Sequence, residues 1–236
     1  MMLPTAIFFD LDDTIISFNG VAIPLWEEIC ETYCRQSGLF QTHQLFNAIQ
    51  HSANWYWSDK ERHRTGRLNL VSARRKVVKL AFQELGVDNI MDAYALADEF
   101  STKRNDRLMV FPGAVETLEE LNRRGVRLAL LTNGDSKGQN YKIAKFNLRK
   151  YFERIFIEGE IGFGKPDKRV YRLALGSMEL TPQEVWMVGD NLEWDVGAPQ
   201  ELGIYGIWND HRKKGLPDSC DVVPDRIIHN ISELVE

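Results

Sequence analysis

The segment Ala6-Ile7-Phe8-Phe9-Asp10-Leu11-Asp12-Asp13-Thr14 decides the fold. Its four apolar residues run without a break into an acidic turn, a pattern that predicts a short strand buried inside a sheet. In an open sheet of parallel strands, binding crevices lie beyond the carboxyl ends of the strands. We therefore expect residues 6–9 to form a buried strand and the acidic turn to lie at the functional edge.

Strand and helix patterns alternate in the second half of the chain. Apolar runs predict strands at Val126–Leu131, Phe156–Ile157, Val185–Val188 and Ile204–Trp208. Amphipathic patterns predict helices at Val115–Arg124, Val170–Met178 and Asp195–Leu202. This alternation predicts an α/β fold, in which a parallel sheet carries helices on both faces.

The stretch from about Ile16 to Asp106 has a different character, because it is rich in helix-forming residues and has little strand pattern. It predicts helices at Leu25–Cys34, Gln44–Tyr56, Val71–Leu85 and Ala93–Phe100, separated by glycines at positions 38, 66 and 86. We therefore expect a helical domain, residues 17–106, inserted into an α/β core domain made of residues 1–16 and 107–236.

Composition narrows the functional classes. The chain has 236 residues, 44% of them apolar, and a formal net charge of −5, which disfavours a nucleic-acid partner. No apolar run approaches the length of a membrane span. The three cysteines do not form a disulfide framework; Cys30 and Cys34 are expected to be buried, and unpaired thiols fit a reducing cytoplasmic location. Oligomeric state is not predicted.

Polar residues follow the predicted strands at three further places. Thr132-Asn133-Gly134 ends one strand, Gly189-Asp190 ends another, and Gly164-Lys165-Pro166-Asp167 lies between them. Carboxylates gathered at one edge repel each other unless a cation or a proton lies among them. Because compact sites with hard oxygen ligands suit Mg²⁺, the sequence predicts Mg²⁺ as the cofactor.

These segments carry a resemblance to a known family. Residues 10–14, 131–134, 164–167 and 189–195 resemble, in this order, the four motifs of the haloacid dehalogenase-like hydrolase superfamily. The inserted helical segment is similar in position to the helical cap of that superfamily. The resemblance implies a Rossmann-like core and a Mg²⁺-dependent phosphatase that hydrolyses a small phosphorylated metabolite, either a sugar phosphate or a nucleotide, through an aspartyl-phosphate.

The resemblance also implies a role for each site residue. Asp10 would be the nucleophile, and Asp12 the acid that protonates the leaving oxygen and then activates water. The metal would be held by the Asp10 carboxylate, the Asp12 carbonyl and the Asp190 carboxylate, with Asp195 in the metal shell. The substrate phosphoryl group would contact Lys165, the hydroxyl of Thr132 and backbone N–H groups near Asn133.

Some nearby residues have a simpler structural interpretation. Asp13 and Thr14 are expected to bond the backbone of their loop. Asp167 is expected to be the N-cap of a helix that starts near Lys168.

Several alternatives stay open. A phosphosugar mutase would use the same Asp10 and Asp12, and a catalytically silent binding module would keep the fold without turnover. A dehalogenase is disfavoured, because such members of the family lack the acid that Asp12 provides. In the helical segment, Trp55, Trp57 and nearby charges such as Arg67 fit either a substrate-binding face or core aromatics beside solvated charges. Arg74 and Arg75 begin a predicted helix, and one of them is a candidate to reach the substrate phosphate. The segment is also expected to act as a movable lid, with hinges near Asn19-Gly20 and Pro112-Gly113.

Overall fold

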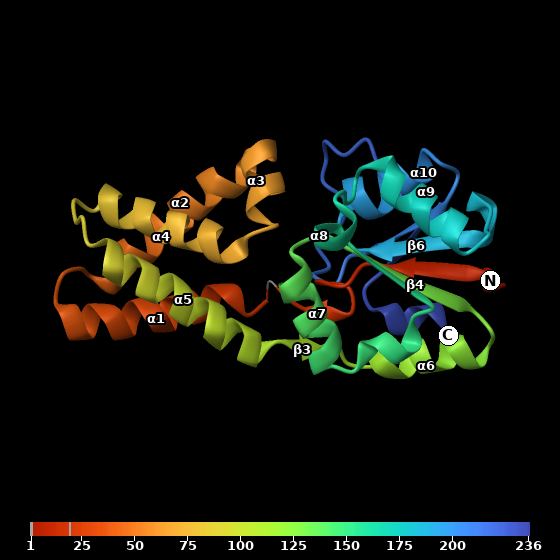
Figure 1. The fold of residues 1–236 in the computed structure, drawn as a ribbon, viewed down its shortest axis with the longest axis horizontal. Helices are drawn as coiled ribbons and strands as arrows, with labels where there is room; N and C mark the ends of the chain where they lie inside the picture. The colour runs from red at the N-terminus through yellow and green to blue at the C-terminus, as the bar shows by residue number, and fades with distance from the viewer. Residues whose placement is uncertain (1, 19) are drawn as a thin grey trace. The chain divides into compact units, whose positions relative to one another are not determined.

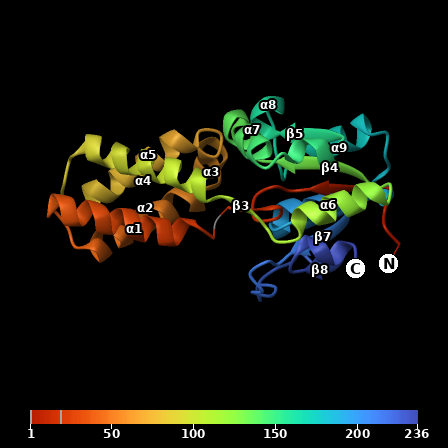
Figure 2. The same cartoon turned by 90° about the horizontal axis from the view of Figure 1, so that it is seen from below.

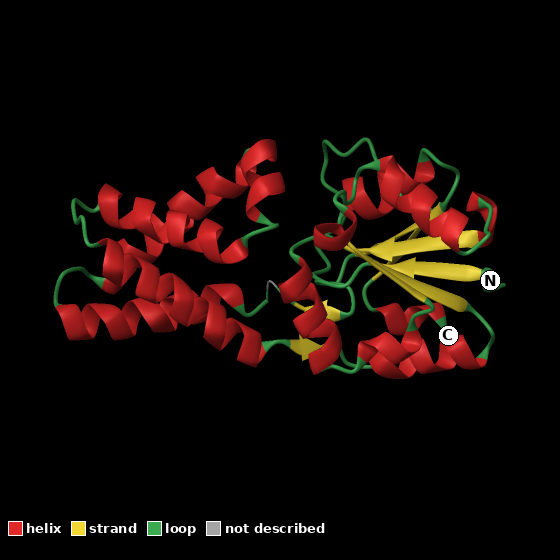
Figure 3. Ribbon diagram, in the orientation of Figure 1, coloured by secondary structure: helices red, strands yellow, loops and turns green. Residues whose placement is uncertain are grey.

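The computed structural model describes residues 2–18 and 20–236, which form two compact units. The first, here called the α/β unit, contains the described residues up to Ser17 together with Met109–Glu236. The second, the helical unit, contains the described residues of Phe18–Leu108. In Figure 3 the strands, drawn in yellow, belong to the α/β unit, and the helical unit is drawn as helices and loops. The expected hinge residue Asn19 lies outside the described residues.

A six-stranded parallel sheet forms the centre of the α/β unit (Figures 1 and 3). Across the sheet its strands are β5 (Arg154–Ile157), β4 (Arg127–Thr132), β1 (Ala6–Phe9), β6 (Val185–Gly189), β7 (Tyr205–Asn209) and β8 (Arg226–Ile228). β1 lies between β4 and β6, with Phe9 opposite Leu130 on one side and Val188 on the other. The predicted α/β fold, with a parallel sheet and a buried first strand, is confirmed.

Helices cover both faces of this sheet. On one face, Ala6 and Phe8 of β1 pack in a buried cluster with Ala174 and Leu175 of α9 (Lys168–Ser177), beside α10 (Ala198–Gln200). Because successive strand residues point to opposite faces, Ile7 and Phe9 lie on the other side, which α6 (Ala114–Arg123) covers (Figures 1 and 2).

Shorter elements complete the α/β unit. They are α7 (Ser136–Lys145), α8 (Glu158–Ile161), the 3₁₀ turns η1 (Leu148–Tyr151), η2 (Pro182–Glu184) and η4 (Ile231–Leu234), and a π-helical turn, η3 (Leu192–Gly197). The helix expected at Asp195–Leu202 therefore starts earlier than predicted, and its first part is a π-helical turn. The reason is the Asn191 side chain, which accepts a hydrogen bond from the Trp194 amide and caps the turn.

A two-stranded ribbon marks the points where the chain leaves the α/β unit and returns to it. β2 (Ile16–Ser17) pairs antiparallel with β3 (Met109–Val110), so Ser17 lies opposite Met109. The Phe111 amide extends the pairing by donating to the Ile15 carbonyl at 2.9 Å. Backbone hydrogen bonds thus join the segment that leaves the α/β unit to the segment that returns to it.

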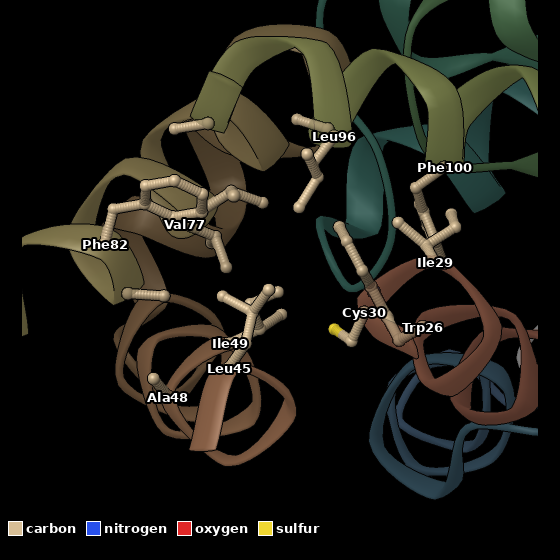
Figure 4. Close-up of a cluster of buried hydrophobic side chains, with 14 of the residues drawn as sticks. Trp26, Ile29, Cys30, Leu45, Ala48, Ile49, Val77, Phe82, Leu96 and Phe100 are labelled. Carbon is tan, nitrogen blue, oxygen red and sulfur yellow. The ribbon is translucent and has the colours of Figure 1, made fainter. Parts of the chain in front are cut away.

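The helical unit consists of α1 (Ala22–Ser37), α2 (Thr42–Ser58), α3 (Lys60–Gly66), α4 (Leu70–Glu84) and α5 (Ile90–Arg107). Its core draws side chains from α1, α2, α4 and α5, as Figure 4 shows. The rings of Trp26 and Phe100 stack at 4.2 Å between centroids. Cys30 and Cys34 are unpaired and buried in this core, and burial raises the pKa of Cys30 to about 12. No helix among the described residues is both long enough and apolar enough to cross a membrane.

The sequence did not predict α3, since its residues are polar and Gly66 indicated a break. Gly66 instead ends α3 and packs closely against the ring of Tyr56, where a β-carbon would clash. The close approach of the Gly66 backbone to the Tyr56 ring, rather than a break in the helix, explains this glycine.

Phe82 provides a test of the helical core. It is 1% exposed and lies against the rings of Tyr33 and Phe40. We expect Phe82→Ala to lower the free energy of unfolding of this unit by about 3–5 kcal/mol, measured by urea denaturation, because the cavity cannot close fully. Met91→Ala is the control, since Met91 is 74% exposed and should cost less than about 0.5 kcal/mol. Equal losses for both variants would contradict the described core.

Candidate functional site

Three neighbouring strands carry polar residues to one edge of the sheet. Asp10 follows β1, Thr132 ends β4, and Asp190 follows β6. Asp195 joins them from the turn η3, and oxygen atoms of Asp10, Asp190 and Asp195 all lie within 4.8 Å of one another. The structure thus brings together most of the residues that the sequence marked as candidates, at the edge where parallel sheets bind ligands.

The turn after β1 fixes the carboxylate of Asp10. The Asp10 amide continues the sheet by donating to the Val188 carbonyl at 2.9 Å. Asp13 turns the chain with a φ of +59°, a left-handed conformation that aspartate tolerates better than most residues. The Thr14 hydroxyl then donates back to Asp10 Oδ2 at 3.3 Å. Thr14 therefore bonds the side chain of Asp10, rather than the loop backbone as expected from the sequence.

Lys165 is 1% exposed and lies between two carboxylates. Its Nζ donates to Asp10 Oδ1 at 2.7 Å and to Asp195 Oδ1 at 2.5 Å. The Asn133 side chain holds the backbone of Lys165, donating to its carbonyl at 2.7 Å and accepting from its amide at 2.8 Å. A buried ammonium requires such partners, because an unpaired charge in the interior is strongly unfavourable.

The expectation that backbone N–H groups near Asn133 bind the phosphoryl group stays a prediction, but one of these groups has a partner within the protein. The Gly134 amide already donates to Glu158 Oε2 at 3.0 Å. The side chain of Asn133 forms hydrogen bonds with the backbone of Lys165. Asn133 therefore positions the lysine in this structure.

Asp195 is 1% exposed and lies inside the π-helical turn η3. Its Oδ2 accepts from the Asn191 amide at 3.0 Å, while its Oδ1 accepts from Lys165. A β-carbon on Gly189 would overlap the Asp195 carboxylate. Glycine is therefore required at the end of β6 so that this carboxylate can lie against the strand.

Burial and mutual repulsion perturb these acids. Burial raises the pKa of Asp10 to about 7, with Lys165 opposing the shift and Asp195 adding to it. Burial, followed by the charge of Asp10, raises the pKa of Asp190 to about 9. Burial alone would lower the pKa of Lys165, but the Asp10 and Asp195 carboxylates hold it above its usual value. Lys165 therefore stays charged. A further cation bound beside Asp10 and Asp190 would favour their ionised forms.

The donor atoms suit a hard divalent cation. Asp10, Asp190 and Asp195 offer only carboxylate oxygens, which Mg²⁺ prefers. A second group within the described residues, Asp13, Asp190 and His211, shares Asp190 but includes a ring nitrogen. In that group Asp13 also faces the Arg212 guanidinium at 3.8 Å. The first group is therefore the better candidate for Mg²⁺.

Asp12 lies apart from this carboxylate group. Lys142 Nζ donates to Asp12 Oδ1 at 2.8 Å and to Oδ2 at 2.6 Å, and Gln139 Nε2 donates to Oδ2 at 3.2 Å. Gln139 Nε2 also donates to the Thr132 hydroxyl. Gln139 and Lys142 were not predicted from the sequence. The available signal was a pair of long polar side chains three residues apart, in the segment that follows the Thr132 motif.

The candidate residues of the helical unit differ in solvent exposure and in their contacts. Tyr56 is buried in the core, and Trp57 packs against it. Trp55 is 46% exposed, with the Arg62 guanidinium 3.8 Å above its ring. Arg75 forms an ion pair with Asp98 at 2.5 Å. Trp55 is thus a more accessible aromatic side chain than its two neighbours in the chain.

Arg75 also lines a hollow of about 540 Å³ within the helical unit. The hollow is lined by Asn69, Val71, Ser72, Arg75, Lys76, Lys79, Leu80, Gln83 and Tyr94. None of these residues belongs to the carboxylate group of the α/β unit, so the two features are separate.

The raised pKa values predict how Mg²⁺ and pH act together on stability. In metal-free protein, folded Asp10 and Asp190 keep protons up to about pH 7 and about pH 9, whereas the ordinary carboxyl pKa is 3.8. The folded state then binds more protons than the unfolded state, so these two groups lower stability as pH rises through that range. Mg²⁺ binds the ionised acids, so its stabilisation should increase with pH.

We expect urea unfolding to show a larger Mg²⁺-induced gain in stability at about pH 8 than at about pH 5.5, each compared with EDTA. Asp190→Asn should weaken both the gain and the pH dependence measured in EDTA. A gain that is equal at the two pH values would contradict the carboxylate site.

Comparison with known proteins places the chain in a family. Residues 4–203 match the model of the haloacid dehalogenase-like hydrolases. A phosphoserine phosphatase from Thermus thermophilus is 32% identical, over 97% of this chain and 96% of that protein. A glyceraldehyde 3-phosphate phosphatase from Pyrococcus furiosus is 25% identical, over 98% and 91%. The magnesium-bound HAD-hydrolase YfnB from Bacillus subtilis shares the fold, with a TM-score of 0.74 and 20% identity over 99% of this chain and 97% of that one. The resemblance noted in the sequence is confirmed, and this chain belongs to the haloacid dehalogenase-like hydrolase family.

Proposed function

We propose that this chain is a Mg²⁺-dependent phosphatase that hydrolyses a small phosphorylated metabolite through an aspartyl-phosphate on Asp10. The observation that carries the proposal is the position of Lys165, whose ammonium group contacts both Asp10 and Asp195. A carboxylate attacking a phosphate ester meets the negative charge of the phosphoryl oxygens, so the site must supply positive charge next to the attacking atom. Relatives named as phosphatases support the same chemistry.

Asp10 is held in position for the attack. Lys165 bonds one of its oxygens and Thr14 the other, which fixes the plane of the carboxylate. A fixed nucleophile loses less entropy on reaching the in-line geometry that phosphoryl transfer requires. In the first step an Asp10 oxygen bonds phosphorus while the bond from phosphorus to the leaving oxygen breaks.

The metal would be held by the Asp10 and Asp190 carboxylates and the Asp12 backbone carbonyl, with Asp195 in the surrounding shell. When bound, Mg²⁺ would neutralise charge on the phosphoryl oxygens and on the acids around them. The group of oxygen donors within 4.8 Å supports this assignment.

Asp12 would move the protons in both steps. It would give its proton to the leaving oxygen, so that the product departs as a neutral alcohol. It would then take a proton from the water that attacks phosphorus, which releases inorganic phosphate and regenerates Asp10. The Thr132 hydroxyl would donate to a phosphoryl oxygen during both steps.

The substrate is proposed to be a small phosphate monoester. The named relatives act on phosphoserine and on glyceraldehyde 3-phosphate, and these extend the predicted classes of sugar phosphates and nucleotides to three-carbon compounds. A mutase would use the same Asp10 and Asp12 but would return the phosphoryl group to a product. Release of inorganic phosphate separates the two reactions.

The proposal is tested by screening such monoesters for phosphate release. We expect turnover with Mg²⁺, none with EDTA, and inhibition by excess Ca²⁺, whose higher coordination number misplaces the nucleophile. Asp10→Asn should reduce kcat by at least about 10³-fold, because the amide cannot form the aspartyl-phosphate.

Asp218→Asn, at an exposed position of the same unit, is the matched control and should keep wild-type kcat. Full activity of the enzyme in chelator would reject the metal assignment. Full activity of Asp10→Asn would reject the nucleophile.

We further propose that the helical unit acts as a cap that selects among substrates. Trp55→Ala and Arg67→Ala should change KM for natural monoesters by several-fold, while kcat for p-nitrophenyl phosphate stays near the wild-type value. Met91→Ala, on an exposed surface of the same unit, is the control. Unchanged KM values across the substrate series would place substrate selection in the α/β unit instead.

A further inference from the structure

The two acids of the turn after β1 have different cationic partners. Asp10 pairs with Lys165, whereas Asp12 pairs with Lys142. Lys142 is 3% exposed and Gln139 is 2% exposed, so both polar side chains are withdrawn from solvent and directed at Asp12. Long polar side chains are rarely buried to this degree unless specific partners hold them.

The hydrogen bonds fix the orientation of each group. Both Asp12 oxygens accept hydrogen bonds from Lys142, and the Gln139 atom that faces Asp12 is the amide nitrogen, which donates to Oδ2. That nitrogen has two N–H groups, and the structure uses one on Asp12 and the other on the Thr132 hydroxyl. Because the Thr132 oxygen accepts from Gln139, its own proton remains available for donation to a phosphoryl oxygen.

Helix α7 is anchored so that Gln139 and Lys142 face the site. Asp135 caps the helix by accepting from the Gly138 amide at 2.7 Å. On another face of the first turns, Ser136 and Asn140 both donate to Glu160 Oε1 of α8, at 2.8 Å and 2.6 Å. These contacts fix the rotation of the helix, and residues 139 and 142, three apart, then project from one face.

We propose that Lys142 and Gln139 are positioning residues that hold the Asp12 carboxylate in one orientation and couple it to the hydroxyl of Thr132. The inference rests on the proposed phosphatase function and assigns to α7 a part in the same reaction. Lys142 bonds both oxygens of Asp12, which sets the plane of the carboxylate. Gln139 links that carboxylate to the Thr132 hydroxyl, which is proposed to bind the phosphoryl group. Helix α7 therefore positions both the group that transfers protons and a group that binds phosphate.

The consequence falls on substrates whose leaving group needs a proton. An alkyl alcohol is a poor leaving group without protonation, whereas p-nitrophenolate leaves readily as an anion. Misplacing Asp12 should therefore slow transfer from alkyl phosphates more than transfer from p-nitrophenyl phosphate. The parameter to measure is kcat/KM, since it covers only the steps through formation of the aspartyl-phosphate.

The experiment is a double-mutant cycle between Lys142→Met and Asp12→Asn, with both esters as substrates. We expect Lys142→Met to lower kcat/KM about 10- to 100-fold for phosphoserine, or for the best alkyl phosphate of the screen, and less than about threefold for p-nitrophenyl phosphate. In the Asp12→Asn background, Lys142→Met should cause no further loss, because its effect acts through Asp12. Lys145→Met, at an exposed position of the same helix, should keep the wild-type values for both esters.

Two further variants keep the inference testable if Lys142→Met does not fold. Lys142→Arg retains the charge, so its kcat/KM for the alkyl ester should lie between the wild-type value and that expected for Lys142→Met. Gln139→Leu should lose less kcat/KM than is expected for Lys142→Met, again more for the alkyl ester than for p-nitrophenyl phosphate. Equal losses for the two esters, or losses that add in the double variant, would overturn the inference. Absence of Mg²⁺-dependent turnover in the wild type would instead overturn the proposed function, so the two failures are distinguishable.

Discussion

The contact of one buried ammonium with two buried carboxylates sets the requirements for the rest of the site. Asp10 and Asp195 approach a common point, and without Lys165 their repulsion and desolvation would oppose folding. The surrounding residues serve this arrangement. Asn133 holds the backbone of Lys165, and the absence of a side chain at Gly189 lets Asp195 reach it. The parallel sheet matters to the chemistry because it delivers these residues from separate strands and loops to one edge.

The structure also keeps two similar acids chemically distinct. Asp10 and Asp12 are two residues apart, and the same charged neighbour could have served both. Instead, Lys165 comes from the loop before α9 and Lys142 from α7, so each acid has a separate cation. A nucleophile must present an unprotonated oxygen to phosphorus, whereas an acid–base group must exchange a proton. Separate partners allow the two environments to be adjusted independently.

Much of this arrangement was predictable from the sequence, for identifiable reasons. β1 is an unbroken apolar run, and Asp10, Thr132 and Asp190 directly follow or end apolar runs, so their convergence follows from the geometry of parallel strands. Predictions failed where the sequence pattern does not reveal the local structure or the side-chain contacts. Helix α7 has Gly138 in its first turn and few apolar residues, which concealed both the helix and its two functional side chains. The side-chain contacts of Asn133 depend on tertiary packing, and spacing along the chain does not encode them.

The ribbon of β2 and β3 has a consequence for how such a protein can change over time. Because Ile16 pairs with Val110, the ends of the long inserted stretch are pinned by the α/β unit itself. The pairing of β2 with β3 brings the two ends of the insertion together. The entropic cost of closing this loop rises only slowly with the number of residues that it contains. Residues between the two strands can be lengthened, shortened or exchanged without altering the register of the parallel sheet. Evolution can therefore diversify the insertion while the acids and lysines of the sheet edge keep their spacing.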